Sequence, residues 1–330
     1  MSKTTFVIGA GASVPYGFPT GAQLSALIMG RPDIFGAGAN GFDHRIPHLL
    51  DNLGIDRGSY VRLRVGLQRV APRSIDSLLE SRTDLLDVGK VALACALLPR
   101  ERSTADTLFP SSGDWIGYLF NRVIGSNFEG ARERISFVTF NYDRLLEHRL
   151  TQYIAATLQV DLQAAWELAQ TFEIIHVYGQ LGPYSPDAEE GRVHWPILDM
   201  GDNLAHTVLA DESRVRLAVE GIRLVHERQD RTDNVRRAQR AVASASLLWF
   251  LGFGYDHTNL SRLRATLGSR TTGSPVFGST LGLYPGEVKL ARAAISKFIN
   301  QTSGQISAAA HHLENADCLG TLRIHADHLR

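Results

Sequence analysis

The sequence predicts an α/β protein built on a parallel sheet with helices on both faces. Short apolar runs rich in β-branched residues alternate along the chain with longer segments of helical periodicity. Each run ends in glycine or polar side chains, and a glycine-rich turn directly follows the first run. Strands that are apolar on both faces are typical of a parallel sheet covered from both sides.

Composition and charge limit the class of protein. The 330 residues are 44% hydrophobic and 21% charged, as in soluble globular proteins. Lys+Arg and Asp+Glu number 34 each, so no net charge favours sequence-specific nucleic acid binding or an anionic membrane. The N-terminal apolar stretch is too short for a signal peptide, and no transmembrane run occurs. With only Cys95 and Cys318, far apart in apolar context, we expect a cytoplasmic protein with buried thiols.

The first half of the chain is predicted to be mostly helical. After the strand at 4–9, Thr20 is a plausible N-cap for a helix, whereas 30–60 lacks periodicity and predicts an irregular excursion. Residues 74–130 then contain three amphipathic helices without a strand between them. We therefore expect a helical insertion subdomain over 30–130, between the two parts of the sheet domain, 1–29 and 131–330.

The second half of the chain alternates between strands and helices. Strands are predicted at 135–141, 172–179, 245–254 and 277–285, with helices at 143–158, about 203–244, 257–268 and 286–300. Ligands bind parallel sheets at the carboxyl ends of the strands. The strand tips are therefore where a functional site is expected; they are residues 9–13, 139–143, 176–179 and 252–256.

The first strand tip, Gly9-Ala10-Gly11-Ala12-Ser13, resembles a phosphate-cradling turn. Glycines allow the backbone to approach a pyrophosphate closely, although a tight strand-to-helix turn also needs glycine for steric reasons alone. Val14 stands where the third glycine of the usual dinucleotide fingerprint is expected. The loop at 14–21, stiffened by two prolines, is instead a candidate cover for a ligand.

Two other strand tips carry candidate catalytic side chains. Asn141 ends the second strand and is expected in the crevice, whereas Asp143 has the alternative role of capping the following helix. On the third strand, alternation would place His176 and Tyr178 on one face. A histidine there is a natural general base, or else a hydrogen-bonded core residue.

Other features have simpler explanations. Gly252 and Gly254 either admit a ligand to the fourth strand tip or merely form its turn, and Asp256 is predicted to cap a helix. The arginine-rich segment 223–240 predicts a solvated helix, with partner binding as the alternative. Four C-terminal histidines lack visible acidic or thiol partners, so no metal site is expected there; they are His311, His312, His325 and His328.

Five motifs in order make the chain similar to a known family. They are GAGAS…GFPT, SIDSLLE, TFNYDRLLE, HVYGQLG and LGFGYD. Over residues 5 to about 285 the chain resembles the bacterial sirtuin-like family, a branch of the silent-information-regulator fold common in anti-phage defence. The resemblance implies a Rossmann-like domain with a helical insertion, and NAD as a substrate rather than a redox cofactor.

The resemblance also implies roles for individual residues. The NAD phosphates and the neighbouring ribose would be held by Gly9, Ala10, Gly11 and Ser13. Asn141 and Asp143 match the asparagine and aspartate of the family's Thr-Gln-Asn-Ile-Asp motif, in which the asparagine orients water or ribose for cleavage. The remaining expected NAD contacts are Thr20, Tyr178, Gly252 and Phe253.

The chain departs from protein-deacylating sirtuins at three points. It cannot build their four-cysteine zinc module, so no zinc is expected, and the arginine that follows their Gly-Ile-Pro is missing after Pro19. The family histidine directly precedes its glycine, but Tyr178 stands there and His176 lies two residues earlier. Either His176 is the base, or Tyr178 replaces it, or the site is impaired; we favour His176.

The leading hypothesis is therefore an NAD glycohydrolase that releases nicotinamide and ADP-ribose and depletes NAD during infection. Asn141 would position the water and His176 would accept its proton. Control would come from self-assembly into a homo-oligomer or from a defence partner, for which a HerA-like ATPase or a short Argonaute are family-level expectations. The alternatives are a non-catalytic NAD or ADP-ribose sensor and, less favoured, a protein deacylase.

Overall fold

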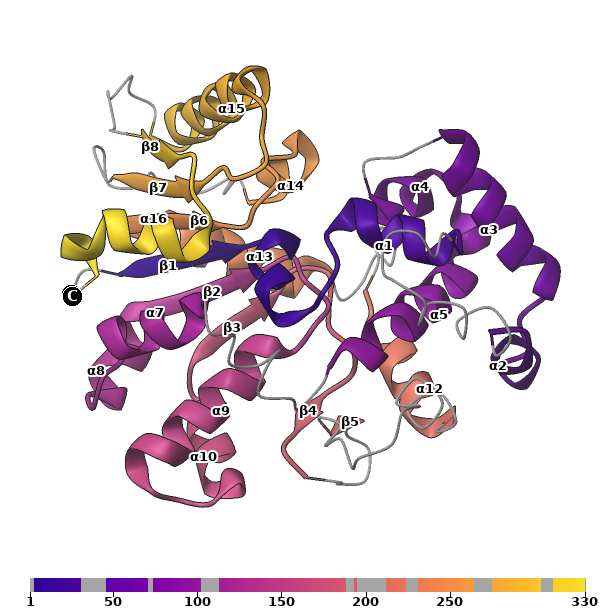
Figure 1. The fold of residues 1–330 in the computed structure, drawn as a ribbon, viewed down its shortest axis with the longest axis horizontal. Helices are drawn as coiled ribbons and strands as arrows, with labels where there is room; N and C mark the ends of the chain where they lie inside the picture. Colours follow the sequence, from indigo (N-terminus) through magenta and orange to yellow (C-terminus); the bar gives the residue numbers. More distant parts are fainter. Residues whose placement is uncertain are drawn as a thin grey trace.

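The apolar runs of the chain form the six parallel strands of one sheet (Figure 1). The coordinates are a computed structural model that describes residues 3–30, 46–70, 74–101, 113–187, 193–194, 212–223, 231–263, 275–303 and 311–329. The strands are β1 (Thr4–Ile8), β2 (Ile135–Thr139), β3 (Glu173–His176), β6 (Leu247–Leu251), β7 (Val276–Ser279) and β8 (His311–Glu314). This confirms the predicted α/β fold class, while β8 was not predicted.

The strands lie in the order β3-β2-β1-β6-β7-β8. Along the chain, β6, β7 and β8 are the fourth, fifth and sixth strands of this sheet. Counted in this way, the spatial order is 3-2-1-4-5-6, which is the order of dinucleotide-binding Rossmann folds. The chain moves from β1 outward in one direction and from β6 outward in the other. The tips of β1 and β6 therefore flank the topological switch point, where such sheets bind ligands.

The two faces of the sheet are distinguished by a row of aromatic side chains. In register across neighbouring strands stand Phe137, Phe6, Trp249 and Phe277, whose rings stack in turn. This face packs against α7 (Trp115–Val123) and α16 (Cys318–Ile324). Thr5, on the opposite face of β1, donates a hydrogen bond to the Ala241 carbonyl of α13 at 2.9 Å. Helices thus cover both faces, as the apolar strands require.

The other helices near the sheet alternate with the strands as predicted, although α8 and α10 were not among the predicted helices. They are α8 (Phe128–Arg134), α9 (Leu145–Leu158), α10 (Leu162–Ala169), α13 (Arg231–Ala243), α14 (His257–Arg262) and α15 (Pro285–Ser303). Short 3-10 turns stand at Ala10–Ala12, Val14–Tyr16, Thr83–Leu85, Leu98–Arg100 and Ala326–His328. None of the described helices is long and apolar enough to cross a lipid bilayer.

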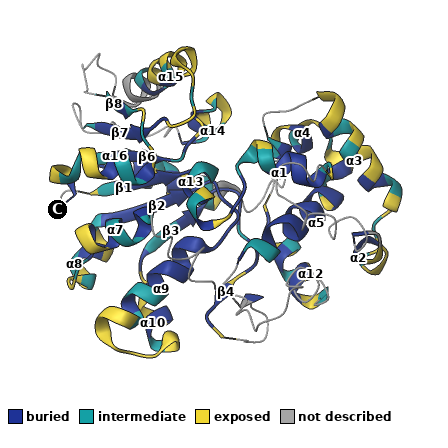
Figure 2. Ribbon diagram, in the orientation of Figure 1, coloured by how far each residue is buried: buried dark blue, intermediate teal, exposed yellow. Residues whose placement is uncertain are grey.

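A second group of helices lies beyond the carboxyl ends of the strands (Figure 1). It consists of α1 (Gly21–Ile28), α2 (Ile46–Asn52), α3 (Arg57–Val70), α4 (Ile75–Ser81), α5 (Leu86–Leu97) and α12 (Glu212–Gly221). The α5 helix contacts all the others and is buried from Val88 to Leu97, as Figure 2 shows. A helix apolar on all sides is stable only inside such a group. A short parallel pair, β4 (Tyr184–Ser185) and β5 (Val193–His194), lies next to α12.

The structure divides the expected insertion at 30–130. Helices α2 to α5 belong to the group around α5, whereas α7 and α8 contact elements of the sheet unit. The irregular excursion predicted for 30–60 is wrong over its second part, because α2 and the start of α3 are helical there; residues 31–45 lie outside the described part. Both cysteines are buried, as expected, and burial raises the pKa of each thiol to about 12.

Candidate functional site

A cavity of about 630 Å³ lies at the switch point, between the strand tips and the helical group. This volume falls within the range of small-molecule sites, about 300–1,000 Å³. The sheet unit contributes the tips of β1, β2 and β6, Tyr178 and the first residues of α14, and the helical group contributes parts of α1 and α4. Its lining residues are Gly9, Ala10, Gly21, Ala22, Ser74, Asp76, Ser77, Glu80, Phe140, Asn141, Tyr178, Phe253, Gly254, Asp256, His257, Thr258, Asn259 and Arg262.

The glycines at the tips of β1 and β6 allow two backbones to touch. A Cβ atom on Gly9 or Gly11 would lie 2.6 or 2.9 Å from the Gly252 carbonyl oxygen. A Cβ on Gly252, whose φ is +58°, would lie 1.9 Å from the Ala12 nitrogen. The steric explanation for these glycines is therefore sufficient. Of the three, only Gly9 lines the cavity, together with Ala10.

Asn141 is the predicted catalytic residue that the structure places at the cavity wall. Its side-chain amide lies 3.2 Å from the Gly9 carbonyl oxygen and 3.0 Å from Ser13 Oγ. Because a carbonyl oxygen only accepts hydrogen bonds, the amide nitrogen must face Gly9, which fixes the orientation of the group. Asn141 Oδ1 is buried and has no hydrogen-bond partner among the described residues. Asn141 thus carries a buried acceptor that is not used within the described part of the protein.

Ser13 and Asp143 lie behind this amide and hold it in place. Ser13 Oγ donates to Asp143 Oδ2 at 2.9 Å, so its lone pair is directed to Asn141. Asp143 also accepts the Leu145 backbone N–H at 3.2 Å at the start of α9, although the N-cap position, considered for Asp143 from the sequence, is taken by Arg144. Burial raises the pKa of Asp143 to about 6, although the hydrogen bond from Ser13 opposes the shift. Neither side chain lines the cavity.

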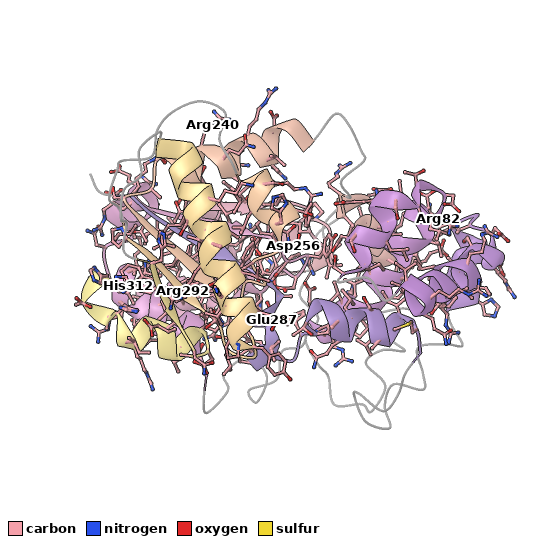
Figure 3. The ribbon with its side chains drawn as sticks, turned by 90° about the horizontal axis from the view of Figure 1, so that it is seen from above. Arg82, Arg240, Asp256, Glu287, Arg292 and His312 are labelled. Carbon is pink, nitrogen blue, oxygen red and sulfur yellow. The ribbon has the colours of Figure 1, made fainter. Side chains whose placement is uncertain are left out.

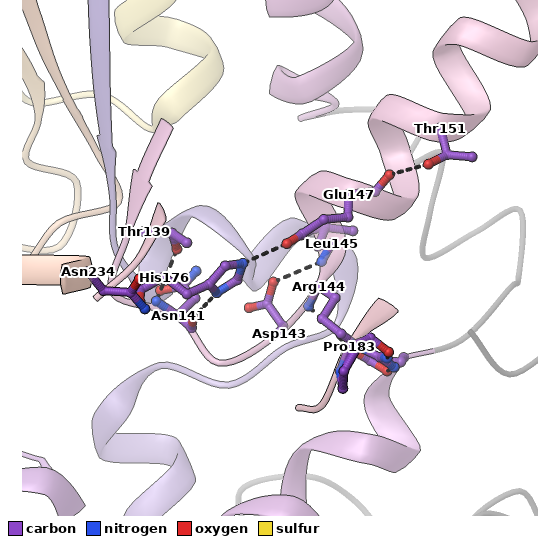
Figure 4. A network of polar contacts seen from close by, with 11 residues as sticks. Thr139, Asn141, Asp143, Arg144, Leu145, Glu147, Thr151, His176, Pro183 and Asn234 are labelled. Atoms are coloured by element: carbon purple, nitrogen blue, oxygen red, sulfur yellow. Dashed lines mark hydrogen bonds and ion pairs between the residues drawn. The ribbon is translucent and has the colours of Figure 1, made fainter. Parts of the chain in front are cut away.

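The structure places His176 behind Asn141 and not among the lining residues (Figure 4). Its Nδ1 lies 2.9 Å from the Asn141 carbonyl oxygen, and its Nε2 lies 2.7 Å from Glu147 Oε1. Burial lowers the pKa of His176, but the Glu147 charge and the hydrogen bonds that the ring makes to Glu147 and to the Asn141 carbonyl outweigh it, so the pKa is raised overall. Each ring nitrogen faces an acceptor, a carbonyl oxygen or a carboxylate oxygen, so neither nitrogen points a free lone pair toward a substrate.

The expectation that His176 and Tyr178 share one strand face is wrong. Strand β3 ends at His176, and Gly179 adopts a left-handed φ of +70°, so the alternation does not continue to Tyr178. Asn234 donates to the His176 carbonyl oxygen at 2.9 Å and holds the strand end. As a result the imidazole turns toward Glu147, while Tyr178 lines the cavity.

Tyr178 belongs to a polar cluster that joins the two walls of the cavity. Arg262 of α14 donates to the Tyr178 hydroxyl and lies with its guanidinium carbon 5.0 Å from the centre of that ring. The same guanidinium forms an ion pair with Glu80 of α4. Asn259, three residues before Arg262 on α14, accepts from the Tyr178 hydroxyl. The lining thus contains a guanidinium whose charge is offset by a carboxylate across the cavity.

A second carboxylate on α4, that of Asp76, is half-buried at the same wall. Asp76 accepts a hydrogen bond from the Tyr142 hydroxyl, and burial raises the pKa of both groups. In dinucleotide-binding folds a carboxylate binds ribose hydroxyls, but it follows the glycine-rich turn within the βαβ unit, whereas Asp76 lies on α4 of the helical group. Asp76, Glu80, Asn259 and Arg262 were not predicted as binding residues. The SIDSLLE motif and the three-residue spacing from Asn259 to Arg262, which places both on one helix face, were the available signals.

The loop at 14–21 does not cover the cavity with its central residues. Tyr16 and Phe18 are buried, and the Tyr16 hydroxyl donates to Asp114 at 2.7 Å. Thr20 caps α1 as predicted, in a capping box with Gln23, and the residue after it, Gly21, is the first of the loop to reach the cavity. Among the expected NAD contacts, Gly9, Ala10, Tyr178 and Phe253 line the cavity, whereas Gly11, Ser13, Thr20 and Gly252 do not.

The comparisons with known proteins add no assignment. No protein-family model matches the chain, and no curated protein is significantly similar to it.

Proposed function

We propose that this protein is an NAD glycohydrolase that cleaves the bond between nicotinamide and ribose. The observation that carries the proposal is Asn141, a lining residue whose amide is fixed by Gly9 and Ser13 and whose buried Oδ1 has no hydrogen-bond partner among the described residues. The strand order supports a dinucleotide as the ligand, because the cavity lies at the switch point of a sheet with that topology.

The polar groups of the lining suit the parts of a dinucleotide. Arg262 offers a guanidinium for the pyrophosphate, which would compete with Glu80 for it. Asp76 and the hydroxyls of Ser74 and Ser77 offer hydrogen bonds to ribose. Phe140 and Phe253, whose ring centres lie 5.3 Å apart, offer an apolar surface to a base.

The chemistry needs positioned polar groups more than a strong nucleophile. The glycosidic bond breaks through an oxocarbenium-like state that water captures. Asn141 Oδ1 would accept a hydrogen bond from that water or from a ribose hydroxyl and so hold it in line. His176 would act as a positioning residue, because its ring holds the Asn141 backbone and carries no free lone pair. This assignment replaces the base role expected from the sequence.

The resemblance of the motifs to the sirtuin-like defence family supports NAD depletion as the biological role. Regulation by self-assembly or by a partner such as a HerA-like ATPase is the corresponding part of the proposal. The absence of a four-cysteine module from the sequence argues against acyl-lysine peptides as co-substrates.

The test is nicotinamide release from NAD by the purified full chain, alone and with candidate partners. We expect turnover without any acyl-lysine peptide, and its loss by at least about a hundredfold in Asn141→Ala. Asn121→Ala, the same change at an exposed position of α7, is the matched control and should retain full turnover. Ser13→Ala should lower kcat more than it changes KM, because it loosens the Asn141 amide without removing a lining side chain.

The same experiment separates the alternatives. NAD or ADP-ribose binding without turnover under every activating condition would overturn the enzyme and favour a sensor. Nicotinamide release only with an acetylated peptide would indicate a deacylase. Equal turnover in wild type and Asn141→Ala would remove the residue on which the mechanism rests.

A further inference from the structure

The aromatic row on the α16 face of the sheet ends in an imidazole. In register beside Phe277 stands His312 of the edge strand β8, and the two rings stack with centres 5.2 Å apart. Glu314, two residues along β8, is on the same strand face as His312. His325 directly follows the last residue of α16. Its ring centre lies 4.7 Å from the ring centre of Phe277 and 5.2 Å from that of His312.

These three side chains present metal-binding atoms to one another. One ligand atom from each of His312, Glu314 and His325 lies within 4.8 Å of the other two. Glu314 Oε1 is 2.9 Å from His325 Nε2, and the His312 ring nitrogens have no hydrogen-bond partner among the described residues. Ligands bound to zinc at about 2.0–2.2 Å lie about 3.4 Å apart in a tetrahedron. Small side-chain rotations therefore suffice to bring the three atoms to coordination distance.

The position of the cluster fits a bound cation. All three residues are half-buried, so an ion could enter from solvent and keep water as its remaining ligand. Figure 3 shows His312 at the end of the molecule opposite Arg82, with Asp256 of the cavity between them. The cluster is thus separate from the cavity. The sequence did not reveal it, because the carboxylate comes from a strand that was not predicted.

We propose that His312, Glu314 and His325 bind a divalent late transition metal ion, with zinc as the representative. Two imidazoles and one carboxylate suit such ions, whereas magnesium and calcium prefer oxygen ligands. The ion would fasten α16 to the edge strand and so stabilise the end of the sheet. The alternative is an ion pair between Glu314 and His325 beside a stacked ring, with no affinity for metal.

The proposal is tested on the full chain without an affinity tag, after treatment with a chelator. Calorimetric titration with Zn²⁺ should show a single equivalent bound and a rise of several degrees in Tm. Co²⁺ should produce the visible absorption bands of a site with nitrogen and oxygen ligands. Absence of binding, or binding without any change in Tm, would overturn the proposal.

Variants assign the ligands without removing the packing. His312→Phe keeps a ring on Phe277 but cannot coordinate, and Glu314→Gln has the same shape without the charge. Each should weaken Zn²⁺ binding at least about tenfold. His328→Phe is the matched control, because this ring also lies against Phe277, at 4.8 Å, but is not one of the three ligands. If His312→Phe does not fold, the test rests on Glu314→Gln. An unchanged affinity of Glu314→Gln for Zn²⁺ would contradict the proposal.

Discussion

The Nε2 atom of His176 lies 2.7 Å from Oε1 of Glu147, and both side chains are buried. This pairing changes the role that we assign to the histidine at the third strand tip. A residue whose type and position suggest a general base instead holds the backbone of Asn141 through its other nitrogen, at 2.9 Å. The candidate chemistry therefore depends on a neutral amide supported by a buried ion pair.

The pairing predicts how stability depends on pH. The pKa of His176 is raised in the folded protein, so its protonated form stabilises the fold. This stabilisation is complete below the pKa of the unfolded chain, 6.5, and is lost as pH rises through the pKa of the folded protein. In Glu147→Gln the anion is absent. We expect the unfolding free energy of this variant to be about 1–3 kcal/mol below that of the wild type at pH 6, and the difference to become smaller above neutral pH. Urea denaturation of both proteins across this range measures it; a deficit independent of pH would contradict the charged pair.

Asp143 predicts a second pH dependence at lower values. Its pKa is raised to about 6 from 3.8, so the folded state binds the proton more tightly and stability falls as pH rises between these values. The difference corresponds to about 3 kcal/mol. The side-chain amide introduced by Asp143→Asn keeps an acceptor for Ser13 and does not titrate, so the variant should lack this decline. Unfolding curves at about pH 4 and pH 7 compare the two, and parallel losses would refute the assignment.

The contact between the tips of β1 and β6 predicts a severe effect of one methyl group. In Gly252→Ala the new Cβ meets the Ala12 nitrogen at 1.9 Å, and φ is already left-handed. We expect destabilisation of at least about 3 kcal/mol. Gly254→Ala is the matched control two residues away, where nothing lies within 4 Å, and should change stability by less than about 0.5 kcal/mol. Denaturant midpoints distinguish them.

The Glu80–Arg262 ion pair predicts opposite effects on dinucleotide affinity. If Arg262 binds the pyrophosphate, Arg262→Gln should raise the Kd for NAD about tenfold, and Glu80→Gln should lower it by releasing the guanidinium. Arg240→Gln, at an exposed position of α13, is the control for loss of one positive charge. Calorimetry at constant ionic strength measures all three. Weaker binding in both cavity variants would show that the pair is needed intact.

Much of the fold could be predicted because local patterns specify it. Apolar runs and helical periodicity indicated five of the six strands and most helices, and capping residues such as Thr20, Ser74 and Asp256 lie where the structure has helix starts. Strand β8, with the sequence His-His-Leu-Glu, lacks the apolar character of its neighbours because it is an edge strand. Its register beside β7, and hence the cluster around His312, comes from long-range pairing.

For the candidate site, too, some features could be predicted from the sequence and others depend on tertiary packing. The sequence by itself determined that polar and glycine-rich tips follow the strands and that Asn141 ends β2, because parallel strands bring their carboxyl ends together. Only the tertiary structure decided which way each side chain turns. Strand β3 stops at His176, so its ring meets Glu147 of α9 while Tyr178 enters the cavity. Contacts between residues far apart in sequence depend on the packing of whole elements, which no local pattern encodes.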